Sequence, residues 1–126
     1  MNKTKEKVNA AIVIIGNEIL SGRTQDINVV TISLWLNALG VKLEEVRIIP
    51  DIEKKIIKTI NELKKKYNYV FTTGGIGPTH DDITSRSIAR AFNLKYGYHK
   101  KAYALLEKYY GKKDFNFGRK KMAMMP

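Results

Sequence analysis

One glycine-rich stretch decides how the chain is organised: Gly74-Gly75-Ile76-Gly77-Pro78-Thr79-His80-Asp81-Asp82-Ile83-Thr84. It follows an apolar run over residues 69–73, which predicts a buried strand, and it precedes apolar residues at helical spacing. A glycine-rich loop between a strand and a helix is where an open α/β sheet places its ligand site. Because glycine permits positive φ and exposes its N–H groups, such a loop can surround a phosphate.

Two adjacent acids, Asp81 and Asp82, lie in this loop, where the geometry favours a bound anion. A divalent cation best explains the acids, because it lets carboxylates and a phosphate share one place. The alternative is that Asp82 and Thr84 cap the following helix while the glycines make a turn. That alternative does not explain why three glycines and two acids converge on one loop, so we favour a ligand site.

Strands and helices alternate around the loop. The predicted strands cover residues 8–15, 41–49 and 69–73, and the predicted helices cover residues 26–39, 51–67, 84–92 and 100–110. We expect Asp26 or Asn28 to cap the first of these helices and Asp51 to cap the second. The order predicts an α/β protein, a three-layer α/β/α sandwich with a mostly parallel, Rossmann-like sheet.

The helices are expected to bury broad apolar faces. In the first, the residues predicted to face inward are Val29, Ile32, Leu34, Trp35, Leu36 and Leu39. In the last, they are Ala102, Leu105, Leu106 and Tyr109. Residues 119–125 resemble the start of one more element. Since only three strands are readable, we expect residues 1–126 to form a single domain that lacks its C-terminal end.

Composition restricts the partners of the protein. The chain has 126 residues, no cysteine and a net charge of +11. Its lysines are scattered, without a zinc finger, a helix-turn-helix or a base-stacking motif, so we expect no specific nucleic-acid partner. The longest apolar run, residues 10–15, is too short to span a membrane, so no membrane partner is expected. The absence of cysteine fits a cytoplasmic location.

Residues 73–84 resemble the signature of the MoaB/Mog (molybdopterin-binding) domain family. The order Gly-Pro-Thr, any residue, Asp-Asp is most similar to the competence/damage-inducible CinA branch of that family. Three further stretches, residues 15–22, 49–51 and 116–126, agree with the family in order and spacing. Asn17 departs from the pattern, because the family usually has an aspartate at this position.

The resemblance implies a domain that binds molybdopterin or a nucleotide-like ligand through its phosphates. In Mog-type enzymes of molybdenum cofactor biosynthesis, it implies adenylylation of molybdopterin with Mg-ATP. In the CinA branch, it implies hydrolysis of ADP-ribose-type pyrophosphates with a divalent metal, Mg, Mn or Co. Oligomers are common in the family, so a homo-oligomer is expected.

The resemblance also assigns roles by matching motifs. Asp51 and Asp82 match two acids associated with activity, and Asp82 with Asp81 would hold the metal. The residues that match the phosphate-binding loop and its flanks are Thr73, Gly74, Gly75, Gly77 and Thr84. Glu18 is expected either to contact a ribose or to be a plain loop residue, and Ser21 could donate to a phosphate.

Three hypotheses remain open from the sequence. The first is a metal-dependent hydrolase of ADP-ribose-type pyrophosphates. The second is a non-catalytic module that holds a pterin or a nucleotide, which Asn17 favours because it removes one acid. The third is molybdopterin adenylyltransferase, which Asp81 disfavours because it replaces a basic residue of Mog-type proteins.

Overall fold

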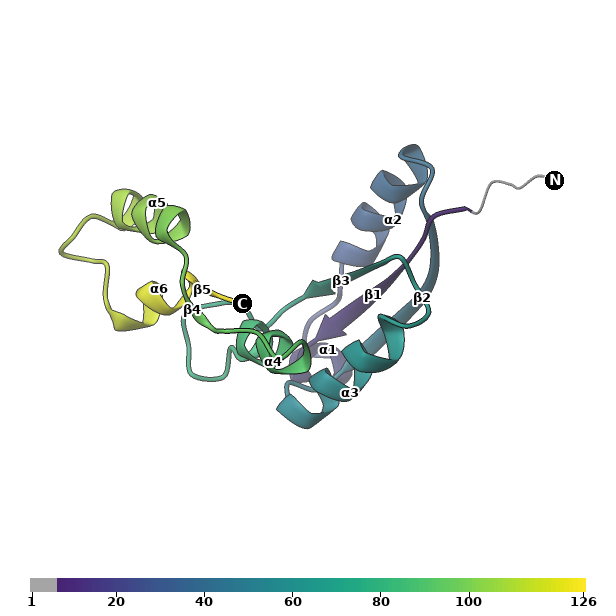
Figure 1. Ribbon diagram of the computed structural model, residues 1–126, viewed down its shortest axis with the longest axis horizontal. Coiled ribbons are helices and arrows are strands. Elements are labelled where there is room, and N and C mark those ends of the chain that lie inside the picture. Colours follow the sequence, from purple (N-terminus) through teal and green to yellow (C-terminus); the bar gives the residue numbers. More distant parts are fainter. Residues whose placement is uncertain (1–6) are drawn as a thin grey trace.

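The computed structural model describes residues 7–126, with the elements in the order that follows (Figure 1). The elements are β1 (Asn9–Ile15), α1 (Asn17–Leu20), α2 (Asn28–Ala38), β2 (Lys42–Ile49), α3 (Glu53–Leu63), β3 (Tyr69–Thr73), α4 (Thr84–Ala91), β4 (Gly97–Tyr98), α5 (Lys100–Tyr110), α6 (Phe117–Lys121) and β5 (Met124–Met125). The predicted bounds of β3 and α5 are confirmed, whereas the short helix α1 was not predicted.

A parallel three-stranded sheet forms the centre of the protein, in the order β2-β1-β3. The central strand β1 is an uninterrupted apolar run because helices cover both of its faces. The edge strand β2 alternates exposed and partly buried residues, with Val46 and Ile48 on the exposed side and the paired Glu45 and Arg47 partly buried. The α/β fold with a parallel sheet is therefore confirmed.

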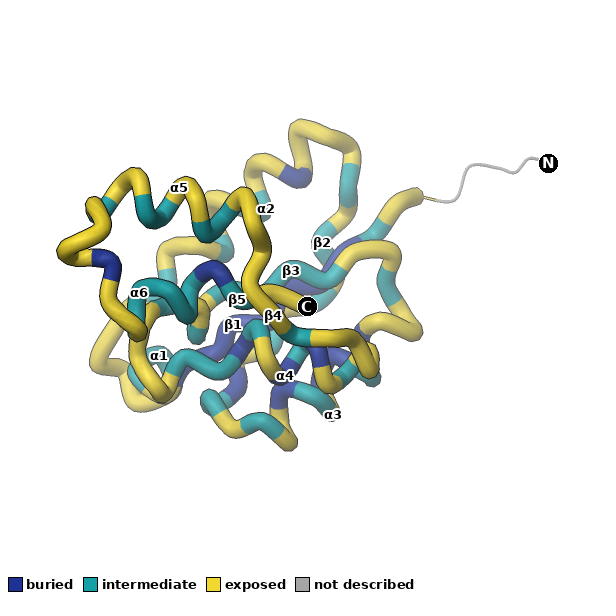
Figure 2. The backbone as a smooth tube through the Cα atoms, turned by 60° about the vertical axis from the view of Figure 1, so that its left-hand side comes forward, coloured by how far each residue is buried: buried dark blue, intermediate teal, exposed yellow. Residues whose placement is uncertain are grey.

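Helices lie on both sides of the sheet, with α2 on one side and α3 and α4 on the other (Figure 1). The core on the α3 side joins Ala11, Val13 and Ile15 of β1 to Ile56 and Leu63 of α3. Figure 2 shows the buried positions gathered along β1 and these helices. Burying each large aliphatic side chain contributes about 1.5–3 kcal/mol, so α3 is held by its apolar face.

The predicted apolar face of α2 is buried at Leu36 alone. Leu34, Trp35 and Leu39 were expected to face inward, but each is about 60–66% exposed. The reason is that α2 packs on the sheet through one side, and no element within residues 7–126 covers its other side. Residues 27–41 contain no charged side chain, so this exposed surface is entirely uncharged and apolar or weakly polar.

A second lobe follows α4 and contains β4, α5, α6 and β5, with β4 and β5 paired antiparallel. Tyr103 packs between Tyr98 and Phe115, at ring-centroid distances of 5.4 Å and 4.9 Å. Leu105 and Tyr109 were expected to face inward but are exposed, because α5 packs mainly on the small helix α6. The element predicted over residues 119–125 is divided between α6 and β5.

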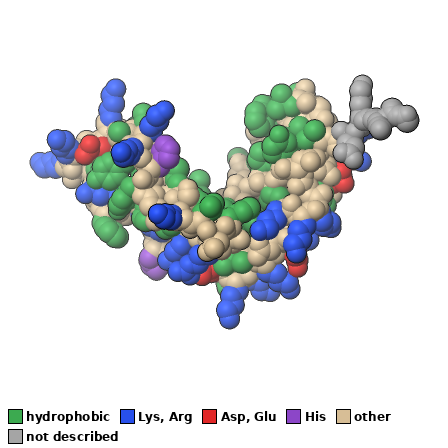
Figure 3. Space-filling model, viewed as in Figure 1, with side chains coloured by type: hydrophobic (Ala, Val, Ile, Leu, Met, Phe, Trp, Pro, Cys, Tyr) green, Lys and Arg blue, Asp and Glu red, His purple; other side chains and the backbone are tan. Residues whose placement is uncertain are grey.

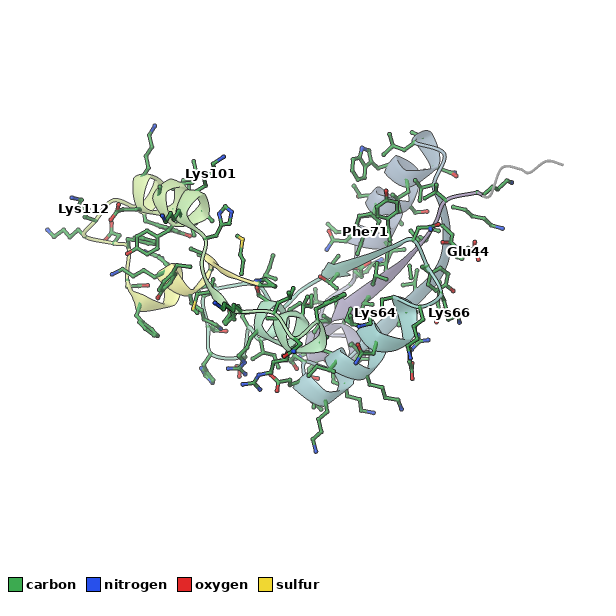
Figure 4. The ribbon with its side chains drawn as sticks, in the orientation of Figure 1. Glu44, Lys64, Lys66, Phe71, Lys101 and Lys112 are labelled. Atoms are coloured by element: carbon green, nitrogen blue, oxygen red, sulfur yellow. The ribbon has the colours of Figure 1, made fainter. Side chains whose placement is uncertain are left out.

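The two lobes enclose a hollow, and apolar side chains over α2 face it (Figure 3). Lysines occupy the outer surfaces, and Lys101 and Lys112 extend from the second lobe into solvent (Figure 4). The lysines therefore lie on solvent-exposed helix faces and are not gathered in one basic groove. No helix within residues 7–126 is both long enough and apolar enough to cross a membrane.

Candidate functional site

The carboxyl ends of the three parallel strands bring three loops together. Residues 16–18 follow β1, Asp51 follows β2, and the glycine-rich loop follows β3. These loops line a cavity of about 530 Å³. Its charged lining residues include Glu18, Arg23, Asp51 and Asp82. This edge of an open parallel sheet is the usual place for a ligand. Glu18, Asp51, Asp81 and Asp82, the acids that the sequence analysis singled out, all line this cavity.

Two glycines of the loop cannot be replaced without distortion. Gly74 and Gly75 have φ values of +90° and +69°, which side chains other than glycine rarely adopt. A Cβ on Gly74 would overlap the carbonyl oxygen of Ile15, and one on Gly75 would overlap Oγ1 of Thr84. The loop therefore passes close to the end of β1, which holds its backbone at the cavity.

Thr84 acts as the internal support of the loop. It is buried, its hydroxyl donates to the carbonyl of Gly74 at 2.8 Å, and its N–H donates to the carbonyl of Gly75 at 3.0 Å. The alternative in which Asp82 and Thr84 cap the helix is wrong, because Ile83 is the N-cap of α4 and no side chain caps it. Thr84 thus shapes the phosphate-type loop and does not line the cavity itself.

Asp82 closes the turn over residues 79–82, and its own N–H donates to the carbonyl of Thr79 at 3.1 Å. Its Oδ2 accepts a hydrogen bond from the N–H of Thr79 at 2.9 Å and from the hydroxyl of Thr79 at 2.8 Å. Partial burial alone would raise the pKa of Asp82, but these bonds, the Gly77 backbone and Lys121 hold the pKa below its usual value. Asp82 is therefore ionised, and one of its oxygens is committed to the loop.

Lys121 ties the second lobe to the same loop. Its ammonium group donates to the carbonyls of Thr79 and Asp82. Helix α6 also approaches the loop at Gly118, where a Cβ would lie 2.8 Å from the carbonyl oxygen of Pro78. The glycine loop is thus held from one side by β1 and α4 and from the other by α6.

Asp51 lines the cavity and has no capping role. The N-cap of α3 is Ile52, and no side chain accepts a hydrogen bond there, so the expected cap at Asp51 is wrong. The cap fails because Asp51 lies one residue before the cap position. Its carboxylate therefore remains available to the cavity.

The remaining predicted residues lie around the site. Ser21 does not line the cavity, because its hydroxyl donates to the Glu18 carbonyl at 3.3 Å and accepts from Arg23 Nε at 3.2 Å. Thr73 ends β3 and pairs with Ile14 in the register of the sheet. Gly77 lies against Asp82 and lines a second cavity, described below.

Arg23 is a candidate site residue that the sequence analysis did not identify. It is the cation that lines the 530 Å³ cavity, and a guanidinium is well suited to phosphate oxygens. The available signal was weak, because Arg23 is a single basic residue in a loop of small and polar residues. Loop geometry, rather than spacing in the sequence, brings it opposite the glycine loop.

The predicted metal ligands are only partly assembled. Within residues 7–126, no group of three or more histidine, aspartate or glutamate side chains is arranged to hold a metal ion. Asp81 is largely exposed and its Oδ1 lies 3.2 Å from Nε2 of His80. The donor set nevertheless fits a hard cation such as Mg²⁺, which takes one or two carboxylates and completes its shell with water and phosphate oxygens. Asp51 and the free oxygen of Asp82 are suitable donors.

The fold and the site together define an α/β domain with a glycine-rich phosphate-type loop at the carboxyl edge of a parallel sheet. Residues 11–126 match the family described as "Probable molybdopterin binding domain". The chain belongs to this molybdopterin-binding (MoaB/Mog) domain family, and its similarity is to CinA-like members.

Two comparisons support the CinA-like assignment, and a third shows a further sequence relative. The solved structure of the protein CinA, of unknown function, from Thermoplasma acidophilum is 31% identical, with a TM-score of 0.87 over 95% of this chain and 71% of its own. A CinA-like protein of Syntrophotalea carbinolica is 31% identical over 121 residues, or 94% of this chain and 29% of its own. A protein of Sulfurisphaera tokodaii is 36% identical over 120 residues, or 93% of this chain and 46% of its own. The chain thus spans less than half the length of these two sequence relatives.

Proposed function

We propose that this domain binds a pterin or nucleotide ligand through its pyrophosphate and hydrolyses ADP-ribose-type pyrophosphates with a divalent metal. The observation that carries the proposal is the meeting of Arg23, Asp51 and Asp82 with the glycine loop in one cavity of about 530 Å³. Cleaving a phosphoanhydride requires neutralised phosphate oxygens and a positioned nucleophile. A cavity with backbone amides, a guanidinium and two carboxylates provides groups for both requirements.

Each residue has a distinct task in this proposal. The N–H groups of the glycine loop and the guanidinium of Arg23 bind the non-bridging oxygens of the pyrophosphate. Asp51 and the free oxygen of Asp82 would hold Mg²⁺, Mn²⁺ or Co²⁺, with Asp81 at the rim of the site. The metal would neutralise charge on the phosphates. Asp51 also lies where it can orient a water molecule toward the pyrophosphate.

The test follows AMP release from ADP-ribose in the presence of Mg²⁺, Mn²⁺ or Co²⁺ in turn. Asp82→Asn is an imperfect control because it also disturbs the turn that Asp82 forms with Thr79. Asp51→Asn is the sharper variant, since that side chain does not cap α3. We expect both variants to lose metal-dependent release while Asp51→Asn keeps the thermal stability of the wild type. Release that persists in Asp51→Asn would contradict its role.

The second candidate is a non-catalytic module that holds the same ligand. It is favoured by Asn17 at the cavity and by the lack of a three-acid cluster within residues 7–126. Saturable binding of ADP-ribose without AMP release, with any of the three metals, would select this candidate. Molybdopterin adenylyltransferase is less favoured, because Asp81 places negative charge at the rim of the site. Transfer of AMP from Mg-ATP to molybdopterin would select that activity instead.

We further propose that the protein is a cytoplasmic homo-oligomer. The uncharged, exposed side of α2 supports self-association, because contact through a surface without lysine or arginine brings no like charges of this basic chain together. Trp35 and Leu34 lie on this side of the helix and are mostly exposed.

A further inference from the structure

A second cavity adjoins the first across the glycine loop. Its volume is about 160 Å³, and its lining includes Gly75, Asp82, Tyr96, Met122 and Met124. Gly75 and Asp82 line both cavities, so the loop forms the partition between them. The two cavities therefore adjoin at the glycine loop.

The two cavities differ in chemistry. The larger one presents charged groups, among them Glu18, Arg23 and Asp51. The smaller one is lined by Tyr96, Met122 and Met124, with Asp82 and Lys121 on the side of the glycine loop. Methionine is polarisable and makes favourable contacts with aromatic rings. The larger cavity thus suits phosphate, and the smaller one suits a flat ring.

The size of the smaller cavity agrees with one ring. An apolar cavity of about 150 Å³ is known to hold benzene. The present cavity, at about 160 Å³, is of the same size and is open at one side. It can therefore accept one ring of a bicyclic heteroaromatic system while the second ring remains at the opening.

Hydrogen bonds within the protein hold part of the wall of the smaller cavity. The hydroxyl of Ser85 donates to the carbonyl of Met124 at 3.1 Å, which joins β5 to α4. Met124 also pairs with Tyr98 in the β4–β5 ladder. Lys121 holds the partition through the carbonyls of Thr79 and Asp82. A preformed cavity loses little ordering entropy on binding, which favours recognition.

We propose that the cavity lined by Tyr96, Met122 and Met124 binds the planar heteroaromatic ring of the ligand whose phosphates lie in the larger cavity. This inference rests on the proposed function, because it places the second half of the same ligand. The ligand class is a flat heteroaromatic ring joined to phosphate by a short linker. Nucleoside phosphates and phosphorylated pterins share this chemistry.

The test compares the dissociation constants of AMP, ribose 5-phosphate and adenosine, measured by titration calorimetry. Stacking a base on such side chains predicts that AMP binds about 10-fold or more tightly than ribose 5-phosphate. Met122→Ala should weaken AMP and adenosine by a similar factor and leave ribose 5-phosphate unchanged. Met122→Leu, which keeps volume and apolar character, should restore most of the loss.

A matched variant in the larger cavity separates the two halves of the site. Arg23→Gln should weaken AMP and ribose 5-phosphate together and leave adenosine unchanged. Equal affinity of the wild type for AMP and ribose 5-phosphate would overturn the ring site. A wild type that binds AMP no better than adenosine would instead overturn the phosphate site and leave the ring site standing. If 6-hydroxymethylpterin diphosphate competes with AMP, and Met122→Ala weakens this competition, the cavity binds pterins as well as purines.

Discussion

Replacing Gly75 by alanine tests the geometry of the glycine loop most fully. Gly75 has a φ of +69°, and a Cβ there would overlap Oγ1 of Thr84. The left-handed backbone costs an alanine about 1–2 kcal/mol. The overlap adds about 1–3 kcal/mol, the usual cost of overpacking a close-packed site. Gly75→Ala should therefore lower the free energy of unfolding by about 2–5 kcal/mol, summed from these two costs.

Two further glycines separate the two costs. Gly22 has a φ of +79° with no atom near its Cβ position, so Gly22→Ala carries the backbone cost alone, about 1–2 kcal/mol. Gly74→Ala places its Cβ against the backbone carbonyl of Ile15, which no side-chain truncation can relieve. The overlap at Gly75, in contrast, is with a side chain that can be removed.

The assay is urea unfolding of Gly75→Ala, Thr84→Ala and the double variant. Truncating Thr84 removes the atom that the new methyl group would meet, although it also breaks the hydrogen bond to Gly74. The loss in free energy of unfolding of the double variant should therefore be about 1–3 kcal/mol smaller than the sum of the losses of the two single variants. Losses that add to within about 0.5 kcal/mol would refute the contact. A Gly75→Ala variant no less stable than Gly22→Ala would refute it as well.

Three other outcomes follow from the structure. Lys121→Met should increase amide hydrogen exchange in residues 77–83, because it removes the donor to the Thr79 and Asp82 carbonyls, while exchange in β1 stays unchanged. The pKa of Asp82 is lowered in the folded protein, so its contribution to stability is present above the usual value of 3.8 and is lost as the pH falls through the lowered value. Asp82→Asn should therefore reduce the loss of stability at acidic pH, measured by unfolding curves over a pH series. Leu34→Lys should lower the mass measured by light scattering, because it puts charge on the exposed side of α2, and a mass equal to that of the wild type would remove this surface from the interface.

Much of the fold could be predicted because its strongest signals are local. The run over residues 10–15 is apolar without interruption, which is typical of a strand covered on both faces, and it became the central strand β1. Helix α3 combines lysines with isoleucines at helical spacing, so its existence was predicted. The glycine loop was placed correctly because its residue types have few other uses.

The errors arose where a residue's environment is set by distant parts of the chain. Helix α2 is apolar on nearly every side, so its periodicity does not indicate which residues face the sheet. The cap predicted at Asp51 depends on the backbone of one residue, and the helix starts one position later than its composition indicates. Arg23 reaches the site through the path of a loop, which no sequence spacing encodes.

The central claim is that the cavity bounded by the glycine loop binds phosphate through Arg23 and the loop amides. Its most direct test is calorimetric titration of the wild type and Arg23→Gln with ADP-ribose in the presence of Mg²⁺. The account predicts saturable one-to-one binding that weakens by about 10-fold or more in the variant, since a charged hydrogen bond contributes about 1.5–3 kcal/mol. Binding of equal strength in both proteins, or none to the wild type at millimolar ligand, would contradict it.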